Sequence, residues 1–150
     1  MFEDLRDLYQ EVILDHGRRP RHGTRLAAFD ASAKGDNPMC GDRIEVWVQH
    51  GTDGKIAEAG FEARGCAISV ASADLMAEVV AGRSDDEVRA LAGDFRVMAR
   101  TGEAPDENDA MERLAPLAGV HEYPSRVKCA TLAWHALLSA LNGNGGATSE

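Results

Sequence analysis

The chain has 150 residues, of which 44% are hydrophobic and 27% are charged, and its formal net charge is -9. These proportions describe one soluble globular domain that is long enough to bury a core. The acidic balance argues against a nucleic-acid partner, because phosphates are met by a basic face. No apolar run is long enough to cross a bilayer, and the acidic, amphipathic start is unlike a secretory signal, so we expect a cytoplasmic protein without membrane contact.

The first half of the chain predicts a helix followed by a small antiparallel sheet. Residues 3–16 repeat apolar side chains every three or four positions, which is typical of a one-sided helix. A first strand is predicted over residues 26–33. Residues 43–49 alternate between apolar and polar side chains and predict a second strand. An Asp-Gly turn within residues 50–55 then returns the chain as a third strand over residues 56–64.

The second half changes to a helical period. Ser69 is the expected N-cap of a helix over residues 70–81, and Ser84 with Glu87 forms the Ser-x-x-Glu pattern that opens another helix. The polar segment 101–109 is predicted to be a connecting loop. Two further helices are expected, a short one around residues 111–117 and a long one from Tyr123-Pro124 to Leu141.

These elements predict an α+β fold in which a three-stranded antiparallel sheet packs against several helices. We expect one domain over residues 1–141, because no repeat or composition change marks a second one. Residues 142–150 are rich in Gly and Asn and are predicted to be a flexible C-terminal tail.

Three cysteines, Cys40, Cys66 and Cys129, fall at the junctions or starts of these elements. An odd number in a reducing compartment argues against a disulfide scaffold. Free cysteines are often just small buried hydrophobes, and that is the alternative to a functional role. Two features favour function: Gly41 and Gly65 stand beside two of the cysteines, where a backbone can approach an ion, and Asp42 follows Cys40 by two positions.

The predicted site is one metal centre formed by Cys40, Asp42, Cys66 and Cys129. Three thiolates and one carboxylate suit tetrahedral Zn²⁺, and the same set can hold an iron–sulfur cluster. The site has to be assembled by the fold, because the cysteines are far apart in the sequence. The five histidines are expected to be solvated at loops and element ends or, for His135, to pack on the last helix, and none is given a metal role.

Three short blocks of the sequence resemble those of a known family, namely residues 37–42, 65–69 and 126–129. They resemble the three signature blocks of the U-type iron–sulfur cluster assembly proteins, the IscU, NifU N-terminal and SufU relatives. The resemblance covers nearly the whole chain and implies a SufE/NifU-like fold. Lys128 stands where the IscU branch has histidine, and the segment between the second and third cysteines is longer, so the chain is most similar to the SufU branch.

The resemblance implies a sulfurtransferase-type carrier with bound Zn²⁺. Cys40 would accept persulfide sulfur from a pyridoxal-phosphate cysteine desulfurase of the SufS-like kind and pass it to a downstream iron–sulfur scaffold or apo-acceptor protein. Cys40, Asp42, Cys66 and Cys129 would hold the metal. Arg126 and Lys128 would support the site by steadying the extra negative charge of a persulfide, and Gly41 and Gly65 would support its backbone.

Two alternatives remain open at this point. The same four residues would serve a scaffold on which a [2Fe–2S] cluster is assembled and transferred, with iron in place of zinc. In the other alternative the protein is a non-catalytic binding module, in which zinc only holds the fold together.

Overall fold

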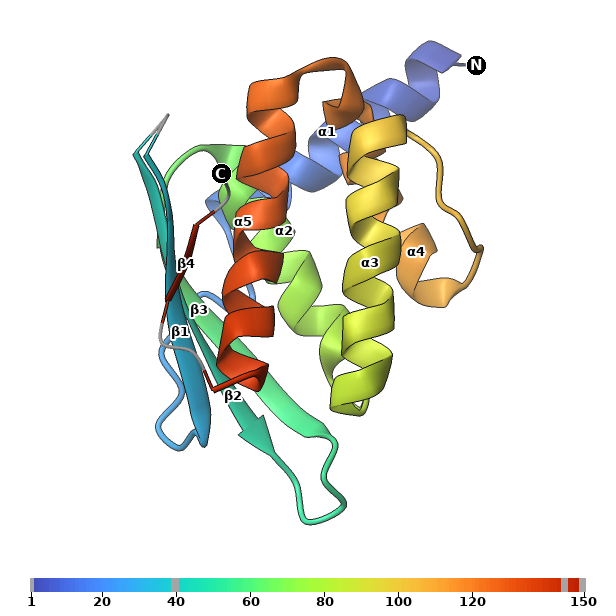
Figure 1. Cartoon of the computed structure of the whole chain (residues 1–150). Helices are drawn as coiled ribbons and strands as arrows, with labels where there is room; N and C mark the ends of the chain where they lie inside the picture. Colours follow the sequence, from blue (N-terminus) through green and yellow to red (C-terminus); the bar gives the residue numbers. More distant parts are fainter. Residues whose placement is uncertain (1, 39–40, 144–145, 149–150) are drawn as a thin grey trace.

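A twisted sheet lies on one side of the molecule, and its inner face is covered by helices (Figure 1). The computed structural model describes the backbone of residues 2–38, 41–143 and 146–148 and the side chains of residues 8–38 and 41–143. Within these ranges the elements in chain order are α1 (Phe2–Arg18), β1 (Ala31–Asn37), β2 (Asp42–His50), β3 (Ile56–Arg64), α2 (Ala67–Val80), α3 (Asp85–Thr101), α4 (Asp109–Leu114), the 3₁₀ helix η1 (Ala115–Glu122), α5 (Pro124–Leu141) and β4 (Gly146–Thr148).

The predicted three-stranded antiparallel sheet is confirmed. β2 lies between β1 and β3 and pairs antiparallel with both. A short fourth strand, β4, pairs parallel with β1 at the other edge, so the sheet order is β3-β2-β1-β4. Three residues of the predicted C-terminal tail are therefore hydrogen-bonded into the sheet.

The predicted position of the first strand is wrong. The strand was predicted over residues 26–33, whereas β1 spans Ala31–Asn37. Leu26 and Phe29 instead belong to a loop, and Phe29 packs on Trp47 with ring centroids 6.4 Å apart. β1 gives no strand signal because its inward positions are small or polar. A Cβ on Gly35 would lie only 3.2 Å from Leu132, so this strand owes its place to close packing against α5.

The core lies between the inner face of the sheet and the helices. Ile44, Val46 and Val48 alternate into it from β2, as their spacing predicts. α2 and α5 cover this face, and α3 packs behind them, where Phe95 stacks on Trp134 at 4.9 Å between centroids. Burial of these apolar side chains is the main source of stability.

The observed helix boundaries match the predicted ones where a capping motif marks them in the sequence, and they differ elsewhere. The Ser84 capping box at the start of α3 is confirmed, with Glu87 as its reciprocal partner. α2 begins at Ala67, three residues earlier than predicted, with Cys66 in the capping position. α3 runs through Thr101 into the segment predicted to be a loop and ends at Gly102, whose φ is 83°.

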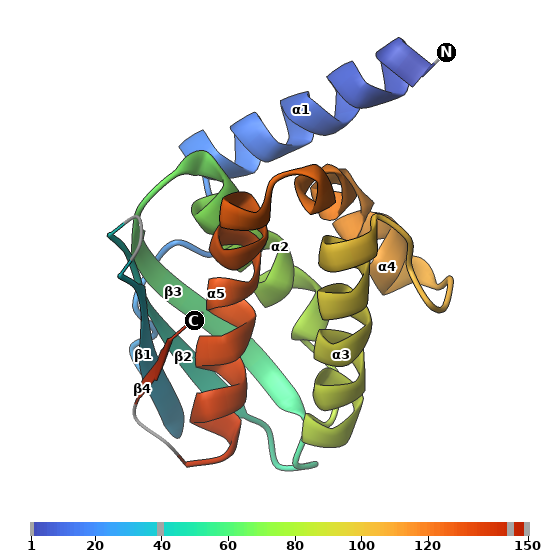
Figure 2. The same ribbon diagram turned by 45° about the horizontal axis from the view of Figure 1, so that its top comes forward.

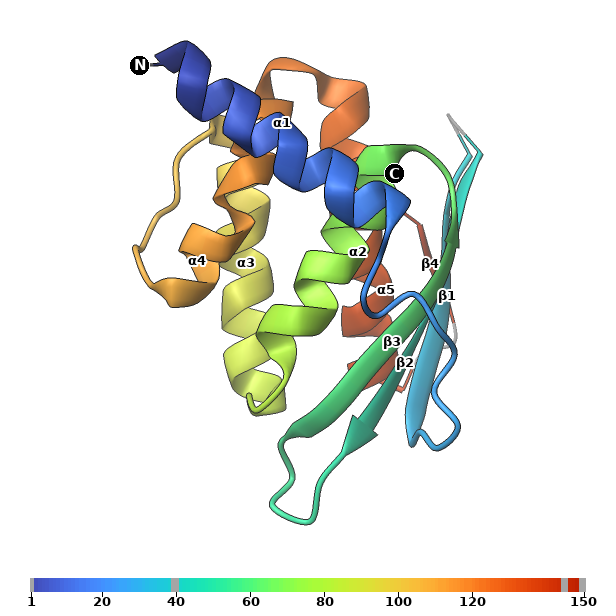
Figure 3. The same ribbon diagram turned by 180° about the vertical axis from the view of Figure 1, so that it is seen from behind.

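α1 crosses the end of the helical layer and packs on α2 (Figures 2 and 3). Near its C-terminus, His16 was expected to be solvated, but its Nδ1 lies 2.5 Å from a carboxylate oxygen of the fully buried Asp74 on α2. The backbone N–H of His22 donates to the other oxygen of Asp74 at 2.8 Å. Together these bonds satisfy a buried carboxylate and hold α1 on α2. None of the helices in the described residues is long and apolar enough to cross a membrane.

His50 also departs from the expectation of a solvated ring. Its Nδ1 lies 2.9 Å from Asp30 and its Nε2 lies 2.7 Å from Asp85, so the ring joins the loop before β1, the end of β2 and the start of α3. The hydrogen bond to Asp85 is the largest cause that raises the pKa of His50. Burial opposes the increase, and the contacts with Asp30 add to it.

The contacts of His50 with Asp30 and Asp85 predict that part of the free energy of unfolding depends on pH. Because the folded pKa of His50 is raised, its contribution is fully present below the unfolded histidine pKa of about 6.5 and is lost as pH rises through the folded value. We expect His50→Gln to lower the free energy of unfolding by about 1 kcal/mol near pH 6 and by less in alkaline buffer. Urea unfolding at several pH values measures this. His121→Gln serves as the control, because the His121 ring makes its hydrogen bond to a backbone carbonyl, that of Ala118, and not to a carboxylate. A pH-independent effect of His50→Gln would contradict a role for its contacts with Asp30 and Asp85.

Candidate metal centre

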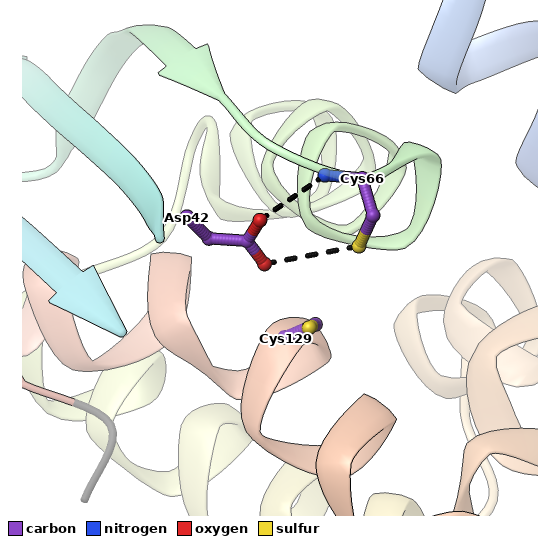
Figure 4. Close-up of side chains that lie close together, drawn as sticks. All are labelled: Asp42, Cys66 and Cys129. Atoms are coloured by element: carbon purple, nitrogen blue, oxygen red, sulfur yellow. Dashed lines mark hydrogen bonds between the residues drawn. The ribbon is translucent and has the colours of Figure 1, made fainter. Parts of the chain in front are cut away.

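Three side chains from distant parts of the chain meet at one end of the sheet (Figure 4). Asp42 is the first residue of β2, Cys66 directly precedes α2, and Cys129 lies in the second turn of α5. One ligand atom from each lies within 4.8 Å of the other two. Asp42 and Cys129 are only 3% and 6% exposed, whereas Cys66 is exposed, so the site opens to solvent on the side of Cys66.

The Asp42 carboxylate is oriented by hydrogen bonds from α2 and the residue before it. Its Oδ1 accepts from the backbone N–H of Cys66 at 3.2 Å. Its Oδ2 accepts from the Ser69 hydroxyl at 2.6 Å and from the Cys66 thiol at 3.8 Å (Figure 4 shows the bonds to Cys66). A buried carboxylate needs such donors, and they hold it in place beside the two sulfur atoms.

Ser69 is the site residue that the sequence analysis missed. It was predicted to cap α2, but it lies inside the helix and is 4% exposed. Besides its bond to Asp42, its hydroxyl lies 3.3 Å from the carbonyl oxygen of Cys129. Its position three residues after Cys66, one helical turn along α2, is the signal in the sequence that places both side chains on the same face.

The three side chains fit a soft divalent metal ion. Three atoms separated by no more than 4.8 Å have a common centre within about 2.8 Å of each, near the Zn–S and Zn–O bond lengths of about 2.3 and 2.1 Å. Two sulfurs with one carboxylate oxygen are ligand types that zinc accepts, and its tetrahedral shell has room for a fourth. The fourth residue of the predicted set, Cys40, lies outside the described residues.

Two glycines shape the backbone around the centre. Gly41 has a φ of 77°, in the left-handed region, as expected for the sharp turn between Cys40 and Asp42. Gly65 lies so close to Asp42 that a Cβ added there would overlap the carboxylate. The absence of a side chain at position 65 is therefore what allows the β3–α2 junction to approach Asp42.

The two cations named as supporting residues lie at the start of α5. Arg126 is exposed, and its guanidinium carbon lies 4.8 Å from the centroid of the Tyr123 ring. Lys128, next to Cys129, is half-buried. Both positions are within three residues of a candidate ligand, but in this conformation Arg126 is stacked on Tyr123.

Comparisons with known proteins identify the family of the chain. The profile of the NifU-like N terminal domain matches residues 8–140. The chain is 41% identical over 137 residues to the iron–sulfur cluster assembly scaffold protein IscU of Streptococcus pyogenes serotype M1, covering 91% of this chain and 84% of that protein. It is 38% identical over 137 residues to the zinc-dependent sulfurtransferase SufU of Bacillus subtilis, covering 89% of each chain.

A solved structure shares the fold. The N-terminal part of a nitrogen-fixing NifU-like protein from Brucella abortus superposes with a TM-score of 0.79 at 25% identity, covering 92% of this chain and 94% of that one. The profile match and the two sequence relatives each span most of the chain. The chain therefore belongs to the NifU-like N-terminal domain family of iron–sulfur cluster assembly proteins, together with proteins named IscU and SufU.

Proposed function

We propose that this protein is a zinc-bound sulfur acceptor for iron–sulfur cluster assembly, with Cys40 as the residue that takes up the sulfur. The observation that carries the proposal is the convergence of Asp42, Cys66 and Cys129, with Cys40 only two residues before Asp42 in the sequence. The name of the Bacillus subtilis relative, a zinc-dependent sulfurtransferase, supports the same chemistry.

The proposed step is a thiol–persulfide exchange with a cysteine desulfurase. The Cys40 thiolate attacks the outer sulfur of a persulfide on the desulfurase cysteine. One S–S bond forms to Cys40 while the S–S bond of the donor breaks, and the donor cysteine leaves as a thiolate. Cys40 then carries the persulfide, and the exchange needs no external oxidant or reductant. The sulfur passes on to an iron–sulfur scaffold or an apo-acceptor protein.

Zinc, when bound by Cys40, Asp42, Cys66 and Cys129, would supply a positive charge that keeps the cysteines ionised at neutral pH. The chain itself supplies the geometry. Asp42, Cys66 and Cys129 come from the start of β2, the junction before α2 and the second turn of α5, and all three junctions are held by the packed core. Cys40 precedes the left-handed Gly41, and this turn is where a change of backbone direction is cheapest.

Arg126 and Lys128 are proposed to stabilise the negative charge of a persulfide at the site. A persulfide is more acidic than a thiol and carries negative charge at neutral pH, and a guanidinium or ammonium group nearby stabilises that charge. Arg126 would have to leave its stacked position on Tyr123 to do so. Lys128 adjoins Cys129 directly.

A second candidate function is assembly of a [2Fe–2S] cluster on the same residues, followed by its transfer. The observation in its favour is the name of the Streptococcus pyogenes relative, a cluster assembly scaffold. Here the iron and sulfide would be cargo. In the third alternative, a non-catalytic module, zinc would stabilise the junction of β2, α2 and α5 and no sulfur would be accepted.

Metal analysis and a desulfurase assay on the same preparation test the proposal. We expect freshly purified protein to contain about one zinc per chain and to increase turnover of a SufS-like cysteine desulfurase. A metallated sample that leaves desulfurase turnover unchanged would contradict sulfur acceptance. Anaerobic treatment with iron and sulfide tests the scaffold alternative, which requires thiolate-to-iron absorption bands and transfer of the cluster to an apo-protein.

A further inference from the structure

Two arginines face each other on the outer surface of the sheet, beside the candidate metal centre. Arg43 on β2 is directly opposite Arg64 on β3 in the strand register, and both side chains are exposed. Arg43 follows Asp42, and Arg64 precedes Cys66 by two residues. The pair therefore lies at the same end of the sheet as the candidate centre, but on its outer face, because successive residues of a strand point to opposite faces.

This pairing is unfavourable for the sheet itself. Like charges directly opposite each other on neighbouring strands destabilise a sheet, by up to about 1 kcal/mol. Among the described side chains, neither guanidinium has a carboxylate oxygen within 4.0 Å. Asp36 lies opposite Arg43 on β1, but it too makes no ion pair within the described residues. Within the described residues, neither arginine is therefore held by an ion pair of the fold.

The charges on this face are sorted into rows. The row next to the site holds Arg43 and Arg64, with Asp36 of β1 beside Arg43, and the row behind it holds Glu45 and Glu62, with Lys34 of β1 beside Glu45. A hollow of about 660 Å³ extends over both rows. Its walls are strands of an open sheet, so it is a shallow, charged surface that a protein segment can cover. The chain as a whole carries a net charge of -9, whereas the row next to the site has two arginines against one aspartate and is locally positive.

We propose that Arg43 and Arg64 dock an acidic segment of the protein sulfur donor beside the candidate centre, an inference that rests on the proposed function. The donor must bring a cysteine persulfide to this end of the sheet, and carboxylates next to that cysteine would meet two guanidiniums that have no partner of their own among the described residues. Arginine binds carboxylates through two parallel hydrogen bonds, which fixes orientation as well as proximity. Carboxylates of the donor would neutralise the two arginines in the complex. The repulsion between Arg43 and Arg64 in the free protein would then disappear on binding, which favours association.

Charge reversal at the two arginines tests the docking. The zinc-loaded protein and the cysteine desulfurase of the same organism are mixed at low ionic strength, and binding is measured by calorimetry and by association kinetics. We expect Arg43→Glu and Arg64→Glu each to weaken binding about tenfold, mainly through slower association, with a flatter salt dependence. Lys55→Glu is the matched control, since Lys55 is exposed in the turn at the opposite end of the same hairpin. We expect it to stay within about twofold of the unchanged protein.

The stability of the variants gives an independent result. Arg64→Glu replaces a like-charge pair by an opposite-charge pair and is expected to unfold at the same temperature as the parent protein or higher, whereas Arg43→Glu also faces Asp36 on β1, so its two cross-strand effects offset each other. If the arginine variants bind the desulfurase as Lys55→Glu does, the docking proposal is wrong. It is also wrong if binding is unchanged and only sulfur uptake falls, because the arginines would then act on the persulfide and not on the donor.

The same samples separate this inference from the proposed function. A parent protein that binds the desulfurase through the arginines but acquires no persulfide would overturn sulfur acceptance and leave the docking surface standing. A parent protein that acquires the persulfide while both arginine variants bind normally would overturn the docking surface alone. Failure of the parent protein to bind the desulfurase at low ionic strength would overturn the docking proposal directly.

Discussion

Replacing Cys40 with alanine is expected to abolish sulfur acceptance and to leave the protein folded. Cys40 supplies the attacking sulfur in the proposed exchange, and alanine has no atom that can form the S–S bond. The acceptance rate should fall by a factor of about 1,000 or more. The fold should survive, because the described core lies between the sheet and the helices and is formed by side chains from β2, β3 and the helices. Asp42, Cys66 and Cys129 remain to hold the metal with reduced affinity.

The measurement combines mass spectrometry of the persulfide with thermal unfolding and metal analysis. Incubation with the desulfurase and cysteine should add one sulfur atom to Cys40 in the parent protein and none to Cys40→Ala. Cys40→Ser is the matched control, since it restores a side chain of similar size that still cannot carry a persulfide. If Cys40→Ala accepts sulfur on another cysteine, Cys40 is not the acceptor. If it loses its zinc and its stability together, the binding-module alternative is favoured.

Replacing Gly65 with alanine is expected to disrupt the candidate centre with the addition of a single methyl group. The new Cβ would overlap the Asp42 carboxylate, which lies in the buried junction of β2 with α2 and has little space in which to retreat. Displacing it would break its bonds to the Cys66 N–H and the Ser69 hydroxyl. We expect zinc affinity to fall by a factor of about 10 to 100 and the free energy of unfolding to fall by about 2 kcal/mol.

Gly93→Ala is the matched control for this substitution. Gly93 lies inside α3 with an ordinary helical backbone, and a Cβ there meets nothing within 4 Å. The same methyl group should therefore stabilise the protein there, by about 0.5 to 1 kcal/mol. Competition with a chromogenic zinc chelator measures the affinities, and urea unfolding measures the stabilities. Parent-like zinc affinity in Gly65→Ala would show that the position of the Asp42 carboxylate does not matter for metal binding.

Elements with a local signal could be predicted from the sequence. The alternation of Ile44, Val46 and Val48 places β2, the Ser84 capping box places the start of α3, and Pro124 places the start of α5. Each of these signals lies within one or two turns of the backbone that it shapes. β1 could not be placed this way, because its strand conformation depends on β2 and α5 and not on its own side chains.

Three of the four residues predicted for the candidate centre lie close together in the structure, whereas Cys40 lies outside the described residues and stays a prediction. Cysteines beside glycines at element junctions mark positions where the backbone can approach an ion, and the structure brings Asp42, Cys66 and Cys129 together. The role of Ser69 was missed because a serine near a helix start is normally a cap, and only the tertiary contact with Asp42 gives its hydroxyl another partner. The contacts of His16 and His50 were missed for the same reason, since their carboxylate partners are distant in the sequence.

Two serines on α2 hold the backbone of α5 at Cys129 in a fixed position relative to Cys66. The Ser69 and Ser72 hydroxyls approach the consecutive carbonyl oxygens of Cys129 and Ala130 on α5, at 3.3 and 2.5 Å. In coordination-chemistry terms, the junction of α2 with α5 presents Cys66 and Cys129 as one preorganised chelating unit, while Asp42 comes from the sheet. A metal ion bound there would keep these two bonds, and its bond to the hydrogen-bonded Asp42, while a fourth ligand leaves. Release of one sulfur ligand would then not require release of the ion.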